Sequence, residues 1–183
     1  MKLAVWRESG PIPRDRARDL FLDGPPEPDE DFAEAFAELF PGVRIDDIAP
    51  ERIDEISNAV FRLAREHGLV CYDPQRGLVH NLEPRGVHPQ LEMHTGDGMV
   101  VTDPDLRLIA DVLGTLSPEN PFVALVCFGQ HFIQVSPGYE LEFKEGGKIR
   151  GTVTTDLAEV RRAFLEYATG DRAFLQRHEW KPV

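Results

Sequence analysis

The first half of the chain alternates apolar runs with apolar stripes of helical spacing. Residues 3–6 form a short apolar run that predicts a buried strand. Residues 30–40 carry large apolar side chains three and four positions apart, while Glu34 and Glu38 fall on the opposite side. This spacing predicts an amphipathic helix with one buried face.

A second helix and a hairpin are predicted next. Residues 50–67 repeat the helical stripe, with Pro50 suited to the first turn and Gly68 suited to the end. Two short apolar runs at 69–72 and 78–82 flank a turn that contains proline and glycine, which predicts a β-hairpin.

The second half is dominated by four apolar runs between residues 122 and 153. The turns between the runs are too short for a parallel crossover, so we predict a four-strand antiparallel meander. A helix capped by Thr102 is expected before the meander, and a helix that begins near Asp156 after it. The late Trp180 is expected to fold back onto the core.

Prolines and glycines divide the chain. Residues 84–98 contain two prolines and three glycines with little periodicity, which predicts a linker or loop. We therefore expect an α+β protein with two small subdomains, 1–83 and 99–183, each with helices packed on an antiparallel sheet.

The negative charge is concentrated in one segment. Twelve acidic residues lie between Asp23 and Glu55 and only Arg44 and Arg52 oppose them, so this segment carries −10 of the net −12. Such a field repels nucleic acid and attracts basic surfaces, which predicts a basic protein partner and no nucleic acid. A solvated face that keeps the protein soluble explains the same charges.

The residues expected to contact a partner are the acidic side chains of this segment and a pair of glutamates that share the polar face of one strand. They are Asp29, Asp31, Glu34, Glu38, Asp46, Asp47, Glu140 and Glu142.

Signals for catalysis are weak. His88, Glu92 and His94 are of metal-ligating types, but no helix fixes their spacing, so we expect no metal. Cys127 and His131 have the types of a thiol and its base, although adjacent strands explain them as core packing. Fingerprints for phosphate or dinucleotide binding are missing, so no cofactor is expected.

A soluble, cytoplasmic protein is expected. Both cysteines lie in apolar runs, as is typical of reduced core residues. The longest apolar run, 122–128, is far shorter than the roughly 20 residues that span a bilayer. The N-terminal residues reach a charge too early for a signal peptide.

Two stretches resemble known bacterial proteins. Residues 66–75, which contain GLVCYDPQ, resemble a segment of small uncharacterised proteins common in actinobacteria. Residues 132–135 and 139–143, with Gly170-Asp171 and Trp180, resemble immunity proteins of polymorphic toxin systems. The second resemblance implies a protein that neutralises a toxin, and it supplies no catalytic residue.

The leading hypothesis is therefore a non-enzymatic binding protein of the immunity type, which blocks a toxin through its acidic surface. A cytosolic ligand-binding or regulatory module, with a pocket between the subdomains, is the second hypothesis. The third is an enzyme with its site in the 80–94 loop.

Overall fold

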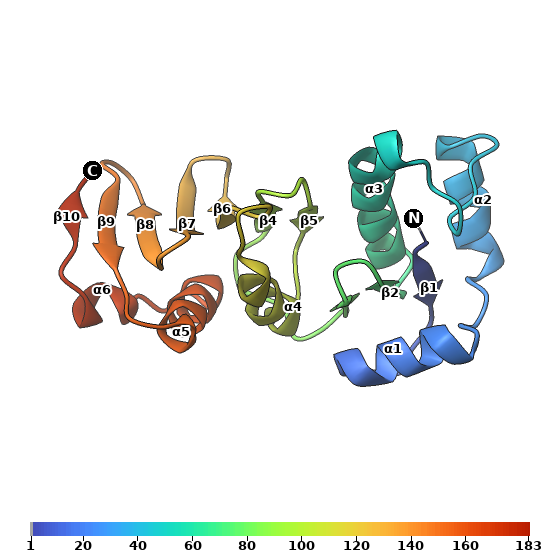
Figure 1. Cartoon of the computed structure of the whole chain (residues 1–183), viewed down its shortest axis with the longest axis horizontal. Coiled ribbons are helices and arrows are strands. Elements are labelled where there is room, and N and C mark those ends of the chain that lie inside the picture. Colours follow the sequence, from blue (N-terminus) through green and yellow to red (C-terminus); the bar gives the residue numbers. More distant parts are fainter. Residues whose placement is uncertain (1) are drawn as a thin grey trace. The chain divides into compact units, whose positions relative to one another are not determined.

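The computed structural model describes residues 2–183 and shows an α+β protein with two antiparallel sheets (Figure 1). The chain divides into an N-terminal unit, Met1–Pro84, and a C-terminal unit, Arg85–Val183. Helices pack against a sheet in each unit. The predicted fold class is thus confirmed.

The N-terminal unit contains a three-stranded sheet. Its elements are β1 (Ala4–Trp6), α1 (Arg14–Asp23), α2 (Glu30–Leu39), the 3₁₀ helix η1 (Pro50–Arg52), α3 (Ile53–Glu66), β2 (Val70–Asp73) and β3 (Leu78–His80). Strand β2 lies between β1 and β3 and is antiparallel to both. The predicted hairpin is confirmed, and the N-terminal strand extends it to a sheet.

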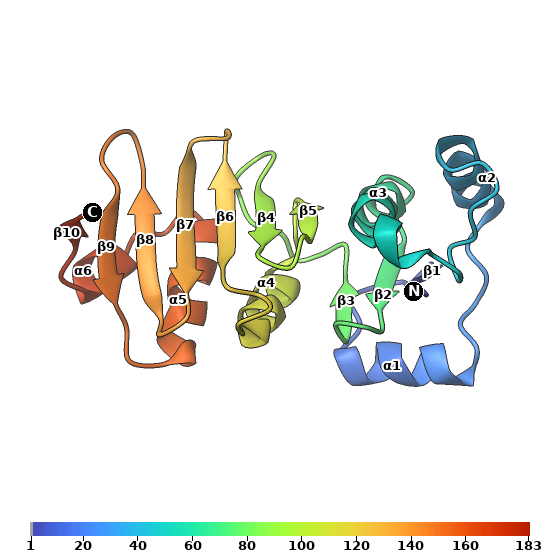
Figure 2. The same cartoon turned by 45° about the horizontal axis from the view of Figure 1, so that its top comes forward.

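Helices cover both faces of this small sheet (Figure 2). Helix α1 covers the face that carries Trp6, Tyr72 and Val79, which form one apolar cluster with Ala17. Helix α3 contacts β2 on the other side, and α2 packs against α3 rather than against the sheet. Helix α2 is therefore an outer element whose inner face alone is buried.

The C-terminal unit contains a seven-stranded sheet. Its elements are β4 (Glu92–Thr95), β5 (Val100–Thr102), α4 (Leu106–Val112), the 3₁₀ helix η2 (Leu113–Thr115), β6 (Val123–Cys127), β7 (His131–Ser136), β8 (Glu140–Lys144), β9 (Arg150–Val153), α5 (Leu157–Ala168), α6 (Phe174–Arg177) and β10 (Lys181–Pro182). The strand order is β10-β9-β8-β7-β6-β4-β5, with every neighbouring pair antiparallel. The predicted meander, β6 to β9, is confirmed.

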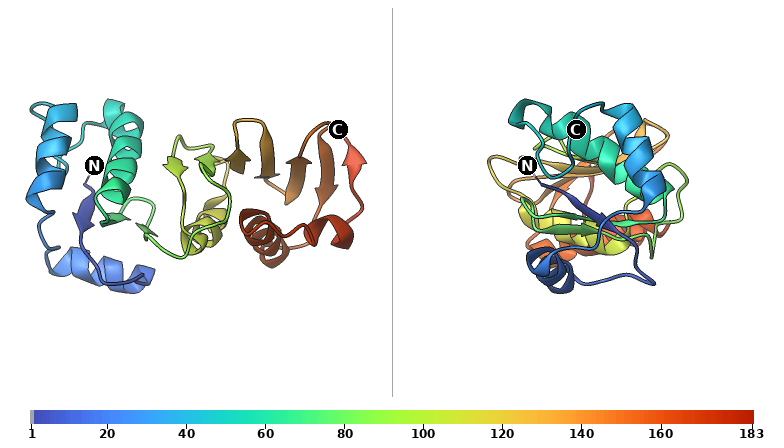
Figure 3. Two further views of the ribbon diagram at one scale, coloured as in Figure 1. Left: turned by 180° about the vertical axis from the view of Figure 1, so that it is seen from behind. Right: turned by 90° about the vertical axis from the view of Figure 1, so that its right-hand side faces the viewer.

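Helices α4, α5 and α6 lie on the same side of the seven-stranded sheet (Figure 3). Phe143 is buried on that side, and its ring lies 5.3 Å from Phe174, 6.1 Å from Tyr167 and 6.1 Å from Trp180, measured between centroids. The predicted return of Trp180 to the core is confirmed by these contacts. Within residues 85–183, all of which the structure describes, no helix covers the opposite side.

The structure corrects the prediction of a linker at 84–98. Residues 92–95 form β4, which is hydrogen-bonded between β5 and β6 inside the sheet. The reason is a period of two: Leu91, Met93 and Thr95 are buried, while Glu92 and His94 alternate with them on the other face. The prolines and glycines lie on either side of this strand and do not interrupt it.

The expected cap at Thr102 is also wrong. Thr102 is the last residue of β5, and the following helix begins at Leu106. Its cap is Asp105, whose carboxylate accepts hydrogen bonds from the N–H groups of Arg107 and Leu108 at 3.1 and 3.0 Å. An aspartate caps a helix as well as a threonine does. Because Val100–Thr102 pair with β4, Thr102 belongs to a strand, and Asp105 becomes the cap.

Candidate functional site

Helix α2 is fixed at its start by Asp29. The Asp29 carboxylate accepts a hydrogen bond from the Phe32 backbone N–H at 3.1 Å, which caps the helix. The same carboxylate forms an ion pair with Arg7. The hydrogen bond from Arg7, assisted by the cap, lowers the pKa of Asp29 below its usual value. Asp29 is therefore a structural residue whose charge is already balanced, although the sequence predicted it as a binding residue.

Aromatic rings hold the inner face of α2. Phe32 and Phe36 are buried, and their nearly parallel rings lie 6.3 Å apart between centroids. The ring of Phe40, just beyond the helix, lies 5.4 Å from that of Phe36. Because these side chains fix the rotation of the helix about its axis, its outer face keeps one orientation toward solvent.

The outer face of α2 carries a stripe of three carboxylates, Asp31, Glu34 and Glu38. All three are exposed, and their spacing of three and four residues places them on one side of the helix. None forms a hydrogen bond or ion pair with any residue in the range 2–183. Asp31 lies in the first turn, where the helix dipole favours a carboxylate. Like charges at such spacings cost an isolated helix roughly 0.2–0.5 kcal/mol per pair, so helix stability does not explain Glu34 and Glu38.

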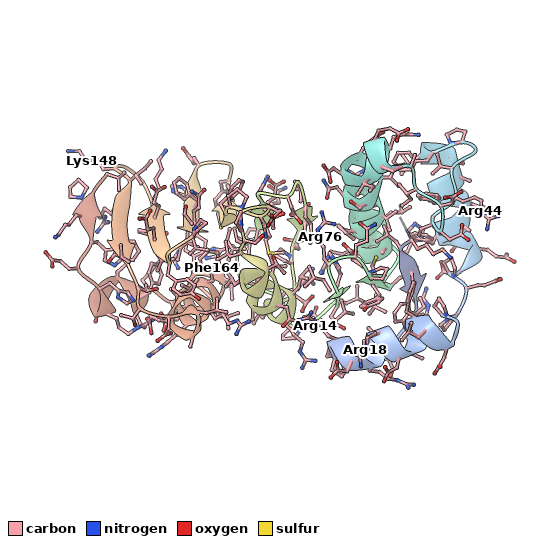
Figure 4. All side chains as sticks on the ribbon, in the orientation of Figure 1. Arg14, Arg18, Arg44, Arg76, Lys148 and Phe164 are labelled. Carbon is pink, nitrogen blue, oxygen red and sulfur yellow. The ribbon has the colours of Figure 1, made fainter. Side chains whose placement is uncertain are left out.

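Asp46 and Asp47 lie in the loop between α2 and η1. Arg44, which Figure 4 labels beside α2, donates to Asp46 through Nε and Nη2 at 2.9 and 2.8 Å. This interaction lowers the pKa of the Asp46 carboxyl, so the charge of Asp46 is balanced. Asp47 is exposed, and its carboxylate has no such partner in the part of the chain that the structure describes. Four of the six predicted residues in this unit thus offer free charge.

Glu140 and Glu142 lie in β8 of the C-terminal unit. Glu140 is exposed and Glu142 is half-buried, and both line an open cavity of about 670 Å³. Arg177, His178 and Lys181 line the same cavity. These three side chains already pair with Glu159, Glu166 or Glu179, and neither Glu140 nor Glu142 forms an ion pair with them. The two glutamates form a candidate surface separate from the α2 stripe.

The histidines of the 80–94 segment do not form a metal site. The Nε2 atom of His88 lies 2.9 Å from the backbone oxygen of Tyr167, and His94 pairs with Glu92 at 2.9 Å within β4. Residues 2–183 contain no group of three or more histidine, cysteine, aspartate or glutamate side chains placed to hold a metal ion. The 80–94 segment, the candidate enzyme site, therefore contains no cluster of metal-ligating side chains.

Cys127 and His131 face each other across β6 and β7, as paired residues of the hairpin. Burial raises the pKa of the Cys127 thiol and that of the Tyr167 hydroxyl, and the two groups also interact with each other. The nearby His131 ring accepts a hydrogen bond from the Gly146 N–H at 3.1 Å. A buried thiol with a raised pKa stays protonated, which makes Cys127 a poor nucleophile.

An ion pair lies beside this thiol that no sequence pattern predicts. Arg172 lies 4.8 Å above the Tyr167 ring centroid and donates to Glu145 at 2.9 Å. These residues come from α5, from the turn after β8 and from the segment before α6, so no local pattern joins them. Only the pairing of β8 with β7, and of α5 with the sheet, brings them together.

His80 is a core residue of the N-terminal unit. Its ring is stacked on Phe61, with centroids 4.0 Å apart, and neither ring nitrogen has a hydrogen-bond partner among the described residues. Burial, and then the positive charges of Arg65 and Arg76, lower the pKa of His80 from 6.5 to about 3. The ring is therefore neutral at neutral pH. Because the folded protein binds a proton at His80 only weakly, protonation of this ring favours the unfolded chain.

We expect His80 to make the protein sensitive to mild acid. The unfolded chain binds a proton at His80 below about pH 6.5, while the folded chain binds it only near pH 3, so unfolding becomes easier as the pH falls between these values. The contribution is about 2 kcal/mol between pH 7 and pH 5. Urea unfolding at both pH values should show this loss in the wild type and a smaller loss in His80→Phe. An equal loss in both proteins, and in His80→Leu, would contradict the assignment.

No helix among residues 2–183 is long and apolar enough to cross a membrane. No protein-family model, curated protein or solved structure matches the chain.

Proposed function

We propose that the protein is a non-enzymatic binding protein of the immunity type, which engages a basic protein partner through the outer face of α2. The observation that supports this proposal is the stripe of Asp31, Glu34 and Glu38, exposed, unpaired and held by the aromatic inner face of the helix. A toxin with a basic cleft is the partner that the resemblance to immunity proteins favours.

The contrast with the rest of the acidic residues strengthens the argument. Several carboxylates of the C-terminal unit are balanced within it, as Glu145 is by Arg172, and as Glu159 and Glu166 are by Arg177. The N-terminal unit has eighteen acidic residues against ten lysines and arginines, a net −8. Summed charge of this kind steers an oppositely charged partner and raises its association rate.

A ligand-binding module is the second candidate, because the N-terminal unit has a cavity of its own. This cavity measures about 460 Å³, and its lining includes β1 and the proline-rich segment before α2. The volume lies in the range of small-molecule sites. Arg44 and Asp46 line it and balance each other, whereas the carboxylate of Glu27 also lines it, so the cavity favours an uncharged or cationic ligand over an anionic one.

The charge reversal Asp31→Lys/Glu34→Lys/Glu38→Lys tests the proposal. Association with a basic partner should slow at least about 10-fold at low salt, because the summed field changes sign over this face. The difference should shrink near 1 M salt, where the Debye length is about 3 Å. The partner for the test is a basic toxin domain, taken from a neighbouring gene where one encodes it, and the readouts are the association rate and the survival of cells that express that domain.

A matched control uses the same number of reversals on another helix of the same unit. Asp15, Asp19 and Asp23 are exposed on α1, so Asp15→Lys/Asp19→Lys/Asp23→Lys changes the net charge equally at a different place. This control should retain most of the association rate. If both triple variants bind and protect as the wild type does, the stripe is only a solvated face and the ligand-binding module becomes the better hypothesis.

A further inference from the structure

The side of the seven-stranded sheet opposite α4, α5 and α6 is a mixed surface of half-buried side chains. Residues paired directly across antiparallel strands point to the same side, so the register identifies this side fully. One row runs across four strands from Glu92 through Val126 and Phe132 to Lys144. The next row runs from His94 through Ala124 and Gln134 to Glu142.

The first row carries opposite charges on β4 and β8, at Glu92 and Lys144, and Glu92 also pairs with His94 of the second row at 2.9 Å. Glu92 and His94 lie on β4, and Lys144 and Glu142 lie on β8, at the same level of each row. The centre of the first row, on β6 and β7, is apolar. Lys144 has no ion-pair partner among residues 2–183, so its charge is free to meet another molecule.

This arrangement is complementary to itself. A twofold axis parallel to the strands, between β6 and β7, places β4 of one copy over β8 of the other. Glu92 then faces Lys144 of the second copy, and His94 faces its Glu142, while Val126 and Phe132 meet at the centre. Each contact occurs twice, as an isologous interface requires.

We propose that the protein forms a twofold dimer through this side of the seven-stranded sheet. Two sheets pack face to face at about 10 Å with their strands nearly aligned, which this axis provides. Burial of Phe132 and Val126 supplies the apolar centre, and the charged residues form the rim and fix the register. The dimer does not depend on the α2 stripe, so the two proposals fail separately.

A charge exchange tests the dimer. Sedimentation equilibrium of the full chain at about 0.15 M salt should show a monomer–dimer equilibrium for the wild type. Lys144→Glu and Glu92→Lys should each weaken the dimer at least about 10-fold, because each places like charges opposite each other. The double variant Glu92→Lys/Lys144→Glu restores opposite charges and should return to within about 3-fold of the wild type.

Lys148→Glu is the matched control. Lys148 lies in the exposed turn between β8 and β9, where Figure 4 labels it, and it carries the same charge outside the two rows. This variant should dimerise as the wild type does. A wild type that stays monomeric up to millimolar concentration would overturn the proposal and leave this side to another partner. So would a double variant that is no better than the two single ones.

Discussion

The Phe143→Ala variant is expected to lose about 3–5 kcal/mol of unfolding free energy, the usual cost of removing a buried aromatic ring. Phe143 is 1% exposed and contacts the rings of Tyr167, Phe174 and Trp180. Its removal therefore leaves a cavity between the sheet and two helices and disturbs the return of the C-terminal segment. Urea unfolding followed by circular dichroism measures the loss.

A second phenylalanine of the same unit provides the control. Phe128 lies in the turn after β6 and is 61% exposed, so Phe128→Ala should change the unfolding free energy by no more than about 0.5 kcal/mol. A loss below about 1.5 kcal/mol in Phe143→Ala would show that the aromatic cluster does not hold this unit together.

The Phe143→Ala variant should also weaken the proposed dimer, because Phe143 lies between Glu142 and Lys144 and fixes the strand that presents them.

The parts of the fold that the sequence predicted correctly are those in which neighbours in sequence are neighbours in space. The β6–β9 meander joins consecutive strands through short turns, so the turn residues and the apolar runs suffice to define it. Helix α2 was predicted for a similar reason, since its apolar period is a local property.

Strands β4 and β5 pair with each other as a short hairpin, but a second pairing that is not local places β4 inside the sheet. Strand β4 pairs with β6, and β5, α4 and η2 separate the two in sequence. Its four residues include glutamate and histidine, which look like loop residues until the sheet buries Met93 and Thr95 on one side. The alternation at 91–95 was the available signal, and the surrounding prolines and glycines obscured it.

In the candidate site, too, the local features could be predicted from the sequence and the contacts between distant residues could not. The exposure of Asp31, Glu34 and Glu38 follows from helical period, and the structure places them on the exposed side as expected. The neutralisation of Asp29 by Arg7 could not be predicted, because 22 residues separate them and only the fold joins them. Arg44 and Asp46 are two residues apart, but sequence proximity alone does not show that both atoms of the guanidinium edge reach one carboxylate.

The Phe32→Ala variant should connect the stability of α2 with binding. Phe32 is 1% exposed and packs against Phe36 and the ring of His67, so its removal should cost about 3–5 kcal/mol. The charges of the stripe remain, so the association rate with a basic partner should change little. The dissociation rate should rise, because a helix free to rotate no longer holds the carboxylates against fixed partner groups.

Two tryptophans allow the N-terminal unit to be followed separately. Trp6 is buried in this unit and Trp180 belongs to the other, so a Trp180→Phe background leaves Trp6 as the single fluorescent reporter. Leu39→Ala is the control in that background, since Leu39 lies in the same helix but is 50% exposed and should cost less than about 1 kcal/mol. Hydrogen exchange in α2 should accelerate in Phe32→Ala and not in Leu39→Ala. If Phe32→Ala loses stability but dissociates from the partner at the wild-type rate, the stripe acts through its total charge alone, and the orientation of α2 is not part of the recognition.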